Sequence, residues 1–313
     1  MKDVMKVYNM KKNLFGFMSI AAFAVLFVLS ACDGGGGSGG SDEEVLAEIG
    51  SGFVKVDGST VVGAISGSEV FIENRTVIIP TLWACDHELT QEEYGVYCNF
   101  AASMASNTSE QYFMGNKYPA CVSWYDALVY CNKRSLAEGL SPCYSINGKT
   151  NPGEWGEVPV VYNDTWNAVS CNFNANGYRL PTEAEWEYLA RGGNTSNSGQ
   201  TVYSGSDDID SVAWYSGNSQ DEMQEVKKKA PNAKGLYDMS GNAYEWCWDW
   251  YGDIIADTPN EGVDAALSNS EKVFRSGCFG DGHNSSSVSR RHEDPPQKRC
   301  NYIGFRLVRT CSE

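Results

Sequence analysis

The sequence has few histidines and no pair of cysteines at metal-binding spacing. Its three histidines are His87, His283 and His292, and no HExxH motif is present. This scarcity argues against a catalytic metal centre built from histidines. The absence of a CxxC pair argues against a zinc ribbon or a thioredoxin-like redox motif.

Basic side chains are also scarce, with 24 Lys and Arg against 40 Asp and Glu and a formal net charge of -16. An acidic surface of this kind repels the phosphates of nucleic acids and of anionic lipids, so we expect neither as a partner. No long apolar stretch occurs after residue 43. We therefore expect the rest of the chain not to cross a membrane.

The N-terminus has the layout of a secretory signal peptide. Four lysines in residues 1–12 precede an apolar run over residues 14–29, and small residues follow, ending at Cys32. The sequence resembles a bacterial lipobox, so we expect residues 1–31 to be cleaved and Cys32 to carry lipid. The alternative is an uncleaved anchor helix, because the apolar run approaches the length that spans a bilayer.

Residues 32–50 are predicted to tether a folded domain to that lipid. Residues 33–41 are almost all Gly and Ser, a composition that behaves as flexible coil. We expect a lipoprotein of the bacterial cell envelope, displayed on the outer-membrane surface. No second spacer of this kind recurs, so residues 51–313 are predicted to form one domain.

Eleven cysteines include Cys32 and leave ten in the domain. An exported chain can form disulfides, whereas a reducing host leaves buried thiols. The spacing does not give a pairing, and both states remain open.

Three helices are predicted by Ser or Thr followed three residues later by Asp or Glu, over residues 90–104, 123–136 and 182–191. Short strands are predicted at 52–56, 68–72, 76–80, 158–162, 272–275 and 304–308. The connections between them are long and rich in Asn, Gly and Ser. The pattern indicates an α+β domain with a modest sheet and many irregular loops, which nine Trp and seventeen Tyr can hold in place.

Several motifs occur in an order that resembles one known family. They are ELTQEEY at 88–94, VSWYDA at 122–127, GYRLPTEAEWEY at 177–188, GLYDMSGNAYEW at 235–246 and GFR at 304–306. The chain resembles the formylglycine-generating enzyme (sulfatase-modifying factor) family over roughly residues 51–309. This resemblance implies a C-type-lectin-like fold, in a loop-rich single domain.

The resemblance does not extend to the family's catalytic cysteines. The family's enzyme uses two cysteines, five residues apart near the C-terminus, to bind copper for oxidation by oxygen. The matching positions hold Asp281 and Ser286, while Cys278 falls three residues too early and Cys300 lies far along the chain. A carboxylate and a hydroxyl do not replace the thiolates that Cu(I) selects. We therefore expect no catalytic residues and no catalytic cofactor.

Segment 274–302 combines family residues with unusual ones. Arg275, Gly277, Arg291 and Arg299 stand where the family has them. The unusual residues, which we predict to bind a ligand, are Phe274, Cys278, Phe279, Asp281, His283, Asn284, Ser286, His292, Glu293, Asp294, Gln297, Cys300, Asn301 and Tyr302. This mixture resembles the variable proteins of diversity-generating retroelements, in particular those of the Treponema type.

Those proteins display a hypervariable ligand-binding surface on this fold. Most of the unusual residue types are reachable by randomising the adenines of an Asn codon, although Glu293, Gln297 and Lys298 are not. The alternative is ordinary drift of a solvated loop in a relative without enzymatic activity.

The family resemblance also implies a structural calcium site in residues 235–246. Its matching groups are Asp238, Gly241, Ala243 and Glu245, and oxygen ligands from a turn suit Ca²⁺. The alternative is that the turn closes itself by hydrogen bonds, with Asp238 as a cap and Glu245 paired to an arginine.

The function that follows is a surface receptor, expected to be a monomer, that binds an unknown protein or glycan ligand at the cell surface. The membrane is a partner only through the lipid anchor. The alternative is a copper-dependent formylglycine-generating oxidase or another enzyme on the same scaffold. A structural envelope component without a specific ligand is a third possibility.

Overall fold

Short helices and short strands alternate along the described part of the computed structural model, which comprises residues 52–100, 114–263 and 270–311. The signal peptide, Cys32 and the tether lie outside these residues. The helices are α3 (Gln91–Tyr97), α5 (Trp124–Ala137), α6 (Asp164–Asn167), α7 (Glu183–Ala190) and α8 (Ile209–Val212), with 3-10 turns η2 (Pro152–Glu154) and η4 (His283–Ser286). None of the described helices has the length and apolar character needed to span a bilayer.

The strands form two main sheets and two hairpins. They are β1 (Phe53–Val56), β2 (Ser59–Val62), β3 (Thr76–Ile79), β4 (Leu82–Cys85), β5 (Tyr144–Ser145), β6 (Ser170–Cys171), β7 (Tyr244–Trp250), β8 (Lys272–Arg275), β9 (His292–Asp294), β10 (Ile303–Gly304) and β11 (Val308–Thr310). One sheet has the order β1-β4-β11 and the other β10-β7-β8-β9, while β2 pairs with β3 and β5 with β6. The prediction of a mixed, loop-rich single domain is confirmed.

The three predicted helix starts are confirmed. Thr90, Ser123 and Thr182 each accept the amide of the third helical residue, whose carboxylate accepts the amide of the capping residue in return. This reciprocal bond depends only on neighbours in the chain, so sequence alone locates it. The first helix, α3, ends at Tyr97, before the predicted end at residue 104. The last part of that prediction, residues 101–104, lies outside the described residues.

Two predicted strands are wrong, and a third, at 304–308, is interrupted, because β10 ends at Gly304, β11 begins at Val308 and residues 305–307 form no strand. Residues 68–72 form a turn, in which the Ser68 hydroxyl accepts the amides of Val70 and Phe71. Residues 158–162 form no strand, and Val160 and Val161 are exposed. Alternating or β-branched residues fit a strand only where a partner strand is available, and here none lies alongside.

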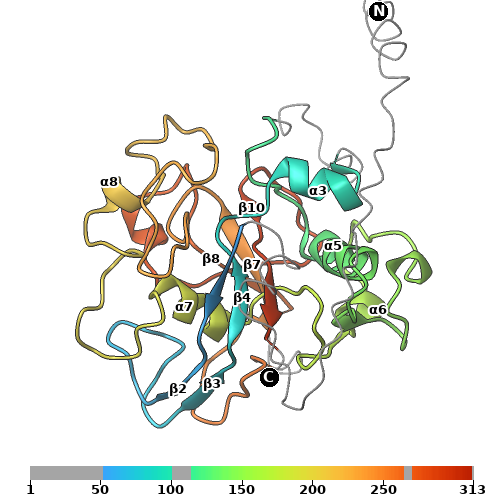
Figure 1. The fold of residues 1–313 in the computed structure, drawn as a ribbon, viewed down its shortest axis with the longest axis horizontal. Helices are drawn as coiled ribbons and strands as arrows, with labels where there is room; N and C mark the ends of the chain where they lie inside the picture. The colour runs from blue at the N-terminus through green and yellow to red at the C-terminus, as the bar shows by residue number, and fades with distance from the viewer. Residues whose placement is uncertain (1–51, 101–113, 264–269, 312–313) are drawn as a thin grey trace, which may run out of the picture. The chain divides into compact units, whose positions relative to one another are not determined.

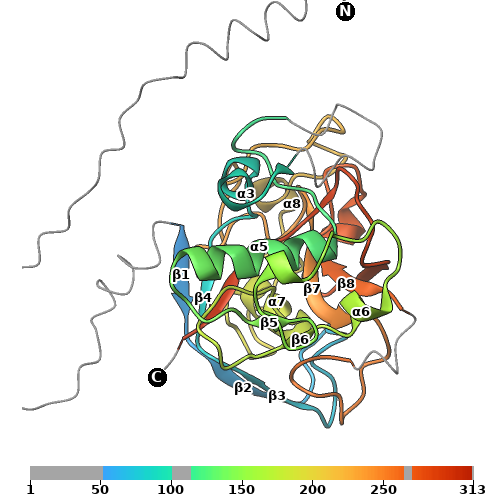
Figure 2. The ribbon, with the colours of Figure 1, turned by 90° about the vertical axis from the view of Figure 1, so that its right-hand side faces the viewer.

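Alternate side chains of the central strands enter two separate cores. In β4, Trp83 and Cys85 join the core beneath α5, whereas Leu82 and Ala84 join the core that includes α7. This division follows from the two-residue period of a strand. In Figures 1 and 2, α5 and α7 accordingly lie on opposite sides of the strands.

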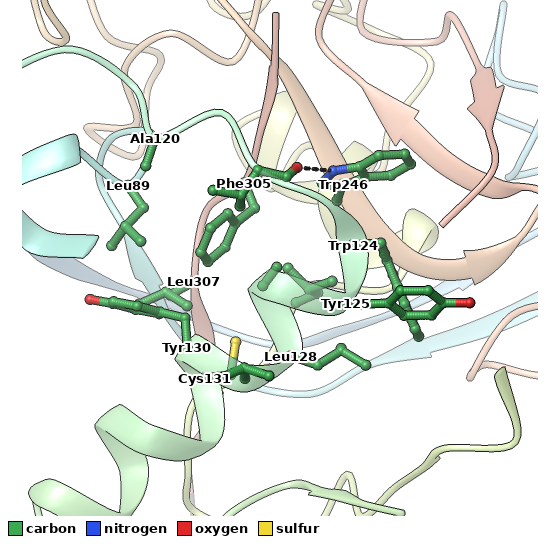
Figure 3. Packing of buried hydrophobic residues seen from close by; sticks show 14 of the residues in the cluster. Leu89, Ala120, Trp124, Tyr125, Leu128, Tyr130, Cys131, Trp246, Phe305 and Leu307 are labelled. Carbon is green, nitrogen blue, oxygen red and sulfur yellow. Dashed lines mark hydrogen bonds between the residues drawn. The ribbon is translucent and has the colours of Figure 1, made fainter. Parts of the chain in front are cut away.

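Phe305, between β10 and β11, is at the centre of the core beneath α5. Its ring lies 5.7 Å from the Tyr130 ring and 6.5 Å from the Tyr94 ring, both edge-on. Figure 3 shows it pointing towards Leu89 and the buried side of α5. Phe305 is completely buried.

None of the ten cysteines within the described residues forms a disulfide bond. Seven of them are buried. Of the two states left open by the sequence, the structure has thiols.

We predict that Phe305→Ala lowers the free energy of unfolding by about 3–5 kcal/mol, because the lost ring leaves a cavity in a closely packed core. Chemical denaturation of the full chain measures this. Val96→Ala is the control, since Val96 is 68% exposed and its truncation should change stability by no more than about 0.5 kcal/mol. Equal losses in both variants would contradict the assignment of Phe305 to the core.

Candidate functional site

Segment 274–302 forms one side of the four-stranded sheet. It begins in β8, passes through η4, returns as the edge strand β9 and ends just before β10. Phe274 of β8 is opposite His292 of β9. Figure 1 shows β7, β8 and β10 side by side at the centre of the domain.

Three arginines fix this segment to helices elsewhere in the chain. Arg275 donates to Glu183 at 2.7 Å, to Glu187 at 2.8 Å and to the carbonyl oxygen of Val288 at 2.7 Å. Arg291 donates to both Glu183 oxygens, at 2.7 and 2.9 Å. The segment is therefore anchored near both of its strands to the first turns of α7.

The third arginine fixes the far end of the segment. Arg299 donates to Asp126 at 2.8 and 3.2 Å, and Asp126 belongs to the first turn of α5. Carboxylates in the first turn of a helix are themselves favoured by the helix dipole. The guanidinium forks thus connect an irregular loop to two well-defined helix starts.

The carboxylate of Glu183 is shared by two of these arginines in a fully buried position. Burial alone raises the pKa of such a carboxyl, but Arg291 and Arg275 outweigh it and lower the pKa of Glu183 below its ordinary value. Glu183 is therefore held charged under the segment. Removing it would leave two buried guanidinium groups short of a counter-charge.

Four of the predicted ligand-binding residues are buried, and this corrects the prediction for them. Phe274, Cys278, Ser286 and Cys300 lie beneath the surface. Phe274 and Cys300 pack in the core under α5. Their side chains can support a binding surface but do not form its exposed part.

His292 is half-buried within a group of aromatic rings. It stacks on Phe274 with ring centroids 5.5 Å apart and meets the Tyr244 ring edge-on at 4.7 Å. Burial, together with Arg290, lowers the pKa of His292 to about 4, so the ring is uncharged at neutral pH. Its Nε2 atom has no hydrogen-bond partner within the described chain. His292 therefore belongs partly to the packing beneath the face.

The remaining predicted residues reach solvent. They are Phe279, Asp281, His283, Asn284, Glu293, Asp294, Gln297, Asn301 and Tyr302, which are exposed or half-buried. Aromatic, acidic and amide side chains of the segment are thus accessible to a ligand. We name this set the segment face. Such a mixture of rigid aromatic and adaptable polar groups is typical of ligand-binding surfaces.

Asp281 is held in place by its neighbours within the face. The Cys278 thiol donates to the Asp281 carboxylate at 3.0 Å. Burial and this contact with Asp281 raise the pKa of Cys278, so the sulfur keeps its proton. The main-chain oxygen of Asp281 accepts the Ser216 amide at 2.9 Å. The carboxylate is consequently oriented before any ligand arrives.

Two contributors to the face were missed by the sequence prediction. Tyr244 lies under it, with ring centroids 4.7 Å from Phe274 and 6.3 Å from Tyr302. Ser219 belongs to the loop before β7 and donates to the carbonyl oxygen of Phe279 at 2.7 Å. Tyr244 belongs to a family motif, so the sequence could have identified it. Nothing in the sequence indicated that residue 219 lies near residue 279.

The comparisons with known proteins agree with this architecture. The model of the sulfatase-modifying factor enzyme 1-like domain family matches residues 50–311. This chain belongs to that family. It is 36% identical to the chaperone protein LppX of Paenibacillus barcinonensis over 254 residues, which are 75% of this chain and 80% of that protein.

Two further relatives link the domain to different members of the family. The formylglycine-generating enzyme of Streptomyces coelicolor is 30% identical over 167 residues, which are 48% of this chain and 52% of that enzyme. The solved structure of Treponema denticola variable protein 1 superposes with a TM-score of 0.68 and 31% identity, covering 83% of this chain and 95% of that one. The predicted C-type-lectin-like fold of the formylglycine-generating enzyme type is confirmed.

The two residues that the sequence analysis matched to the family's catalytic cysteines differ in burial. Asp281 is half-buried, and Ser286 is buried with an Oγ atom that has no hydrogen-bond partner among the described residues. Burial raises the pKa of Cys300 to about 11. The described histidines, cysteines and carboxylates contain no group of three placed to hold a metal ion.

The turn that carries the family's calcium ligands is closed here by protein groups. Asp238 accepts the Lys227 amide at 2.7 Å. Glu245 accepts from Arg306 at 2.6 Å with each oxygen and from the Trp186 indole at 2.8 Å. The hydroxyl of Ser276 donates to the carbonyl oxygen of Gly241 at 3.1 Å.

A further carboxylate, missed by the sequence prediction, occupies the interior of this turn. Glu88 accepts the amide of Ala243 at 2.8 Å and the side-chain amide of Asn242 at 2.6 Å. Burial, with Asp238 and Glu245 nearby, raises the pKa of Glu88. The hydrogen bonds present are those expected of a self-closed turn, in which Asp238 accepts an amide and Glu245 is paired with an arginine.

We predict that Glu183→Gln lowers the free energy of unfolding by about 3–5 kcal/mol, because it removes one partner from a buried ion-pair network. Equilibrium denaturation near neutral pH measures this loss. Glu157→Gln is the matched control, since Glu157 is exposed and its change should stay within about 0.5 kcal/mol.

The stability of Glu183→Gln should also depend on pH differently from that of the natural chain. Because the pKa of Glu183 is lowered on folding, its stabilising effect is present above the unfolded pKa and is lost as the pH falls through the folded value. Stability of the natural chain should therefore fall more steeply on acidification than that of Glu183→Gln. Parallel pH profiles would show that Glu183 is not charged in the folded domain.

We predict that calcium does not stabilise the domain, because Asp238 and Glu245 already have protein partners. The melting temperature of the full chain should be the same in excess calcium as in the presence of a chelator. A site saturated a hundredfold above its Kd adds about 2.7 kcal/mol, which corresponds to a shift of several degrees for a domain of this size. A shift of that size would restore the calcium interpretation.

Proposed function

We propose that this chain is a lipid-anchored protein of the bacterial cell envelope that binds a protein or glycan ligand through the segment face. The observation that supports this proposal is that segment 274–302 contains two kinds of side chain with different roles. Arg275, Arg291 and Arg299 point inward to buried carboxylates. The side chains of the segment face reach solvent and take no part in these ion pairs, so they can change without disturbing them.

The likeness to Treponema denticola variable protein 1 supports a variable binding surface. Diversification by a retroelement is part of the proposal. It requires a near-identical template copy of the 3′ end of the gene beside a reverse transcriptase gene. Sequencing this region tests that part alone, because a fixed segment face can still bind a ligand.

The envelope location rests on the N-terminal sequence. A basic start, an apolar run and Cys32 precede a stretch of Gly and Ser, which is the order of a lipoprotein leader and tether. Labelling cells with a radioactive or alkynyl fatty acid, with Cys32→Ser as the control, tests the anchor. The name of the Paenibacillus relative, a chaperone, favours a protein over a glycan as the ligand.

The alternative is an oxidase of the formylglycine-generating type, which the Streptomyces relative represents. Asp281 and Ser286 at the matching positions supply a carboxylate and a hydroxyl, whereas Cu(I) selects soft thiolates. Incubation with copper, oxygen and a cysteine-containing sulfatase peptide should yield no aldehyde. Formylglycine in the product would establish the alternative instead.

We predict that replacing Phe279, Asp281 and Tyr302 together by Ala strongly weakens ligand binding without unfolding the domain. Removing the aromatic contacts and the oriented carboxylate should cost about 2 kcal/mol or more of binding free energy, roughly thirtyfold in Kd. Binding of the fluorescent full chain to host cells, to bacterial cells and to a glycan array measures the effect.

The matched control replaces three exposed residues outside the segment, Tyr162, Ile255 and Asp257, by Ala. Both triple variants should melt within a few degrees of the natural chain. If the segment variant still binds as the natural chain does, or if the control loses binding equally, the ligand site lies elsewhere.

A further inference from the structure

A second concave site lies outside segment 274–302. It is a pocket of about 360 Å³ whose wall includes His87, Thr90 and Glu93 on one part and Glu92, Lys117 and Lys227 on another. None of these residues is assigned a role by the proposed function. The volume lies at the lower end of the range for small-molecule sites, so the pocket suits a compact ligand.

One part of the wall is a network of polar groups that bond to one another. The His87 ring contacts Asp86 through Nδ1 and Glu93 through Nε2, the latter at 3.3 Å. Although burial opposes a charge on the ring, Cys85, Asp86 and Glu93 raise the pKa of His87 to about 12. Thr90 adds its amide and hydroxyl to the same Glu93 oxygen. This part therefore forms a rigid, polar floor.

In the other part of the wall, Lys227 is paired with Asp86, whereas the exposed side chains of Glu92 and Lys117 have no partner among the described residues. Within the described residues, neither the Glu92 carboxylate nor the Lys117 ammonium takes part in a hydrogen bond or ion pair. Glu225, which is paired with Lys228 at 2.9 Å, adds a weaker negative field near Lys117. Opposite charges thus line one pocket without neutralising each other directly.

The backbone fixes where these two groups stand. The Glu92 amide donates to the carbonyl oxygen of Asn116 at 3.1 Å, and the carbonyl oxygen of Lys117 accepts the Val226 amide at 3.0 Å. Next to it, Lys227 Nζ donates to Asp86 at 2.7 Å and keeps its side chain 38% exposed. A second cation therefore adjoins Lys117.

We propose that this pocket binds a small zwitterion of the amino-acid type, with the ligand carboxylate on Lys117 beside Lys227 and the ligand ammonium on Glu92. A ligand that carries both charges satisfies both unpaired groups at once. A simple anion would leave Glu92 unpaired and repelled, and a simple cation would do the same to Lys117. The site is independent of the segment face.

Isothermal titration of the full chain in detergent with each standard amino acid tests the proposal. Alanine should be among the amino acids that bind, and propionate and ethylammonium, which each carry one of its two charged groups, should bind at least about tenfold more weakly than alanine. Glu92→Gln and Lys117→Gln should each weaken the binding of the amino acid by about tenfold or more. Melting curves verify that both variants fold.

Glu157→Gln and Lys133→Gln change exposed residues of the same types elsewhere and should leave binding unchanged. The proposal is overturned if no amino acid binds or if propionate binds as tightly as alanine. It is equally overturned if the two control variants weaken binding as much as the pocket variants do. Loss of the segment face should have no effect on this titration, which separates the two sites.

Discussion

Glu183 and the two arginines that share it hold the irregular half of this domain in place. All three side chains are almost fully removed from water, where an isolated charge costs several kcal/mol. The arrangement is stable only when every member is present and correctly oriented. Because Arg275 and Arg291 come from β8 and from the approach to β9, this requirement fixes the course of the segment between them. This loop makes few backbone hydrogen bonds to neighbouring strands, so ion pairs between side chains fix its position instead.

Buried arginine–carboxylate ion pairs also occur elsewhere in the fold. Arg306 is bound by both oxygens of Glu245, Arg179 by both oxygens of Glu185, and Arg299 by Asp126. Each pair connects a loop or a short strand to a helix start or to β7. Planar guanidinium groups suit this task, since one fork satisfies two carboxylate oxygens in a single geometry. The short sheets alone would not order loops of this length.

The sequence predicted those features that depend on local bonds or long motifs. The capping boxes at Thr90, Ser123 and Thr182 need only a neighbour three residues away, and the family motifs specify the fold. Which residues of segment 274–302 are buried could not be predicted from local bonds or motifs. Cys278 and Phe274 are buried because β7 and the core under α5 cover them, and residues 68–72 bend because a serine hydroxyl captures two amides. Such outcomes depend on which distant residues come together, which spacing does not encode.

Burial also limits how far the segment face can vary. His292 stacks on Phe274, and Tyr244 meets both rings edge-on, so a change at position 292 alters packing as well as surface chemistry. Positions such as His283, Asn284, Glu293 and Asn301 are exposed and carry no packing role of this kind. A substitution there changes what the surface presents and leaves the arginine network intact. Diversity without loss of the fold is therefore available at the solvent-facing positions, and the half-buried ring at 292 marks their boundary.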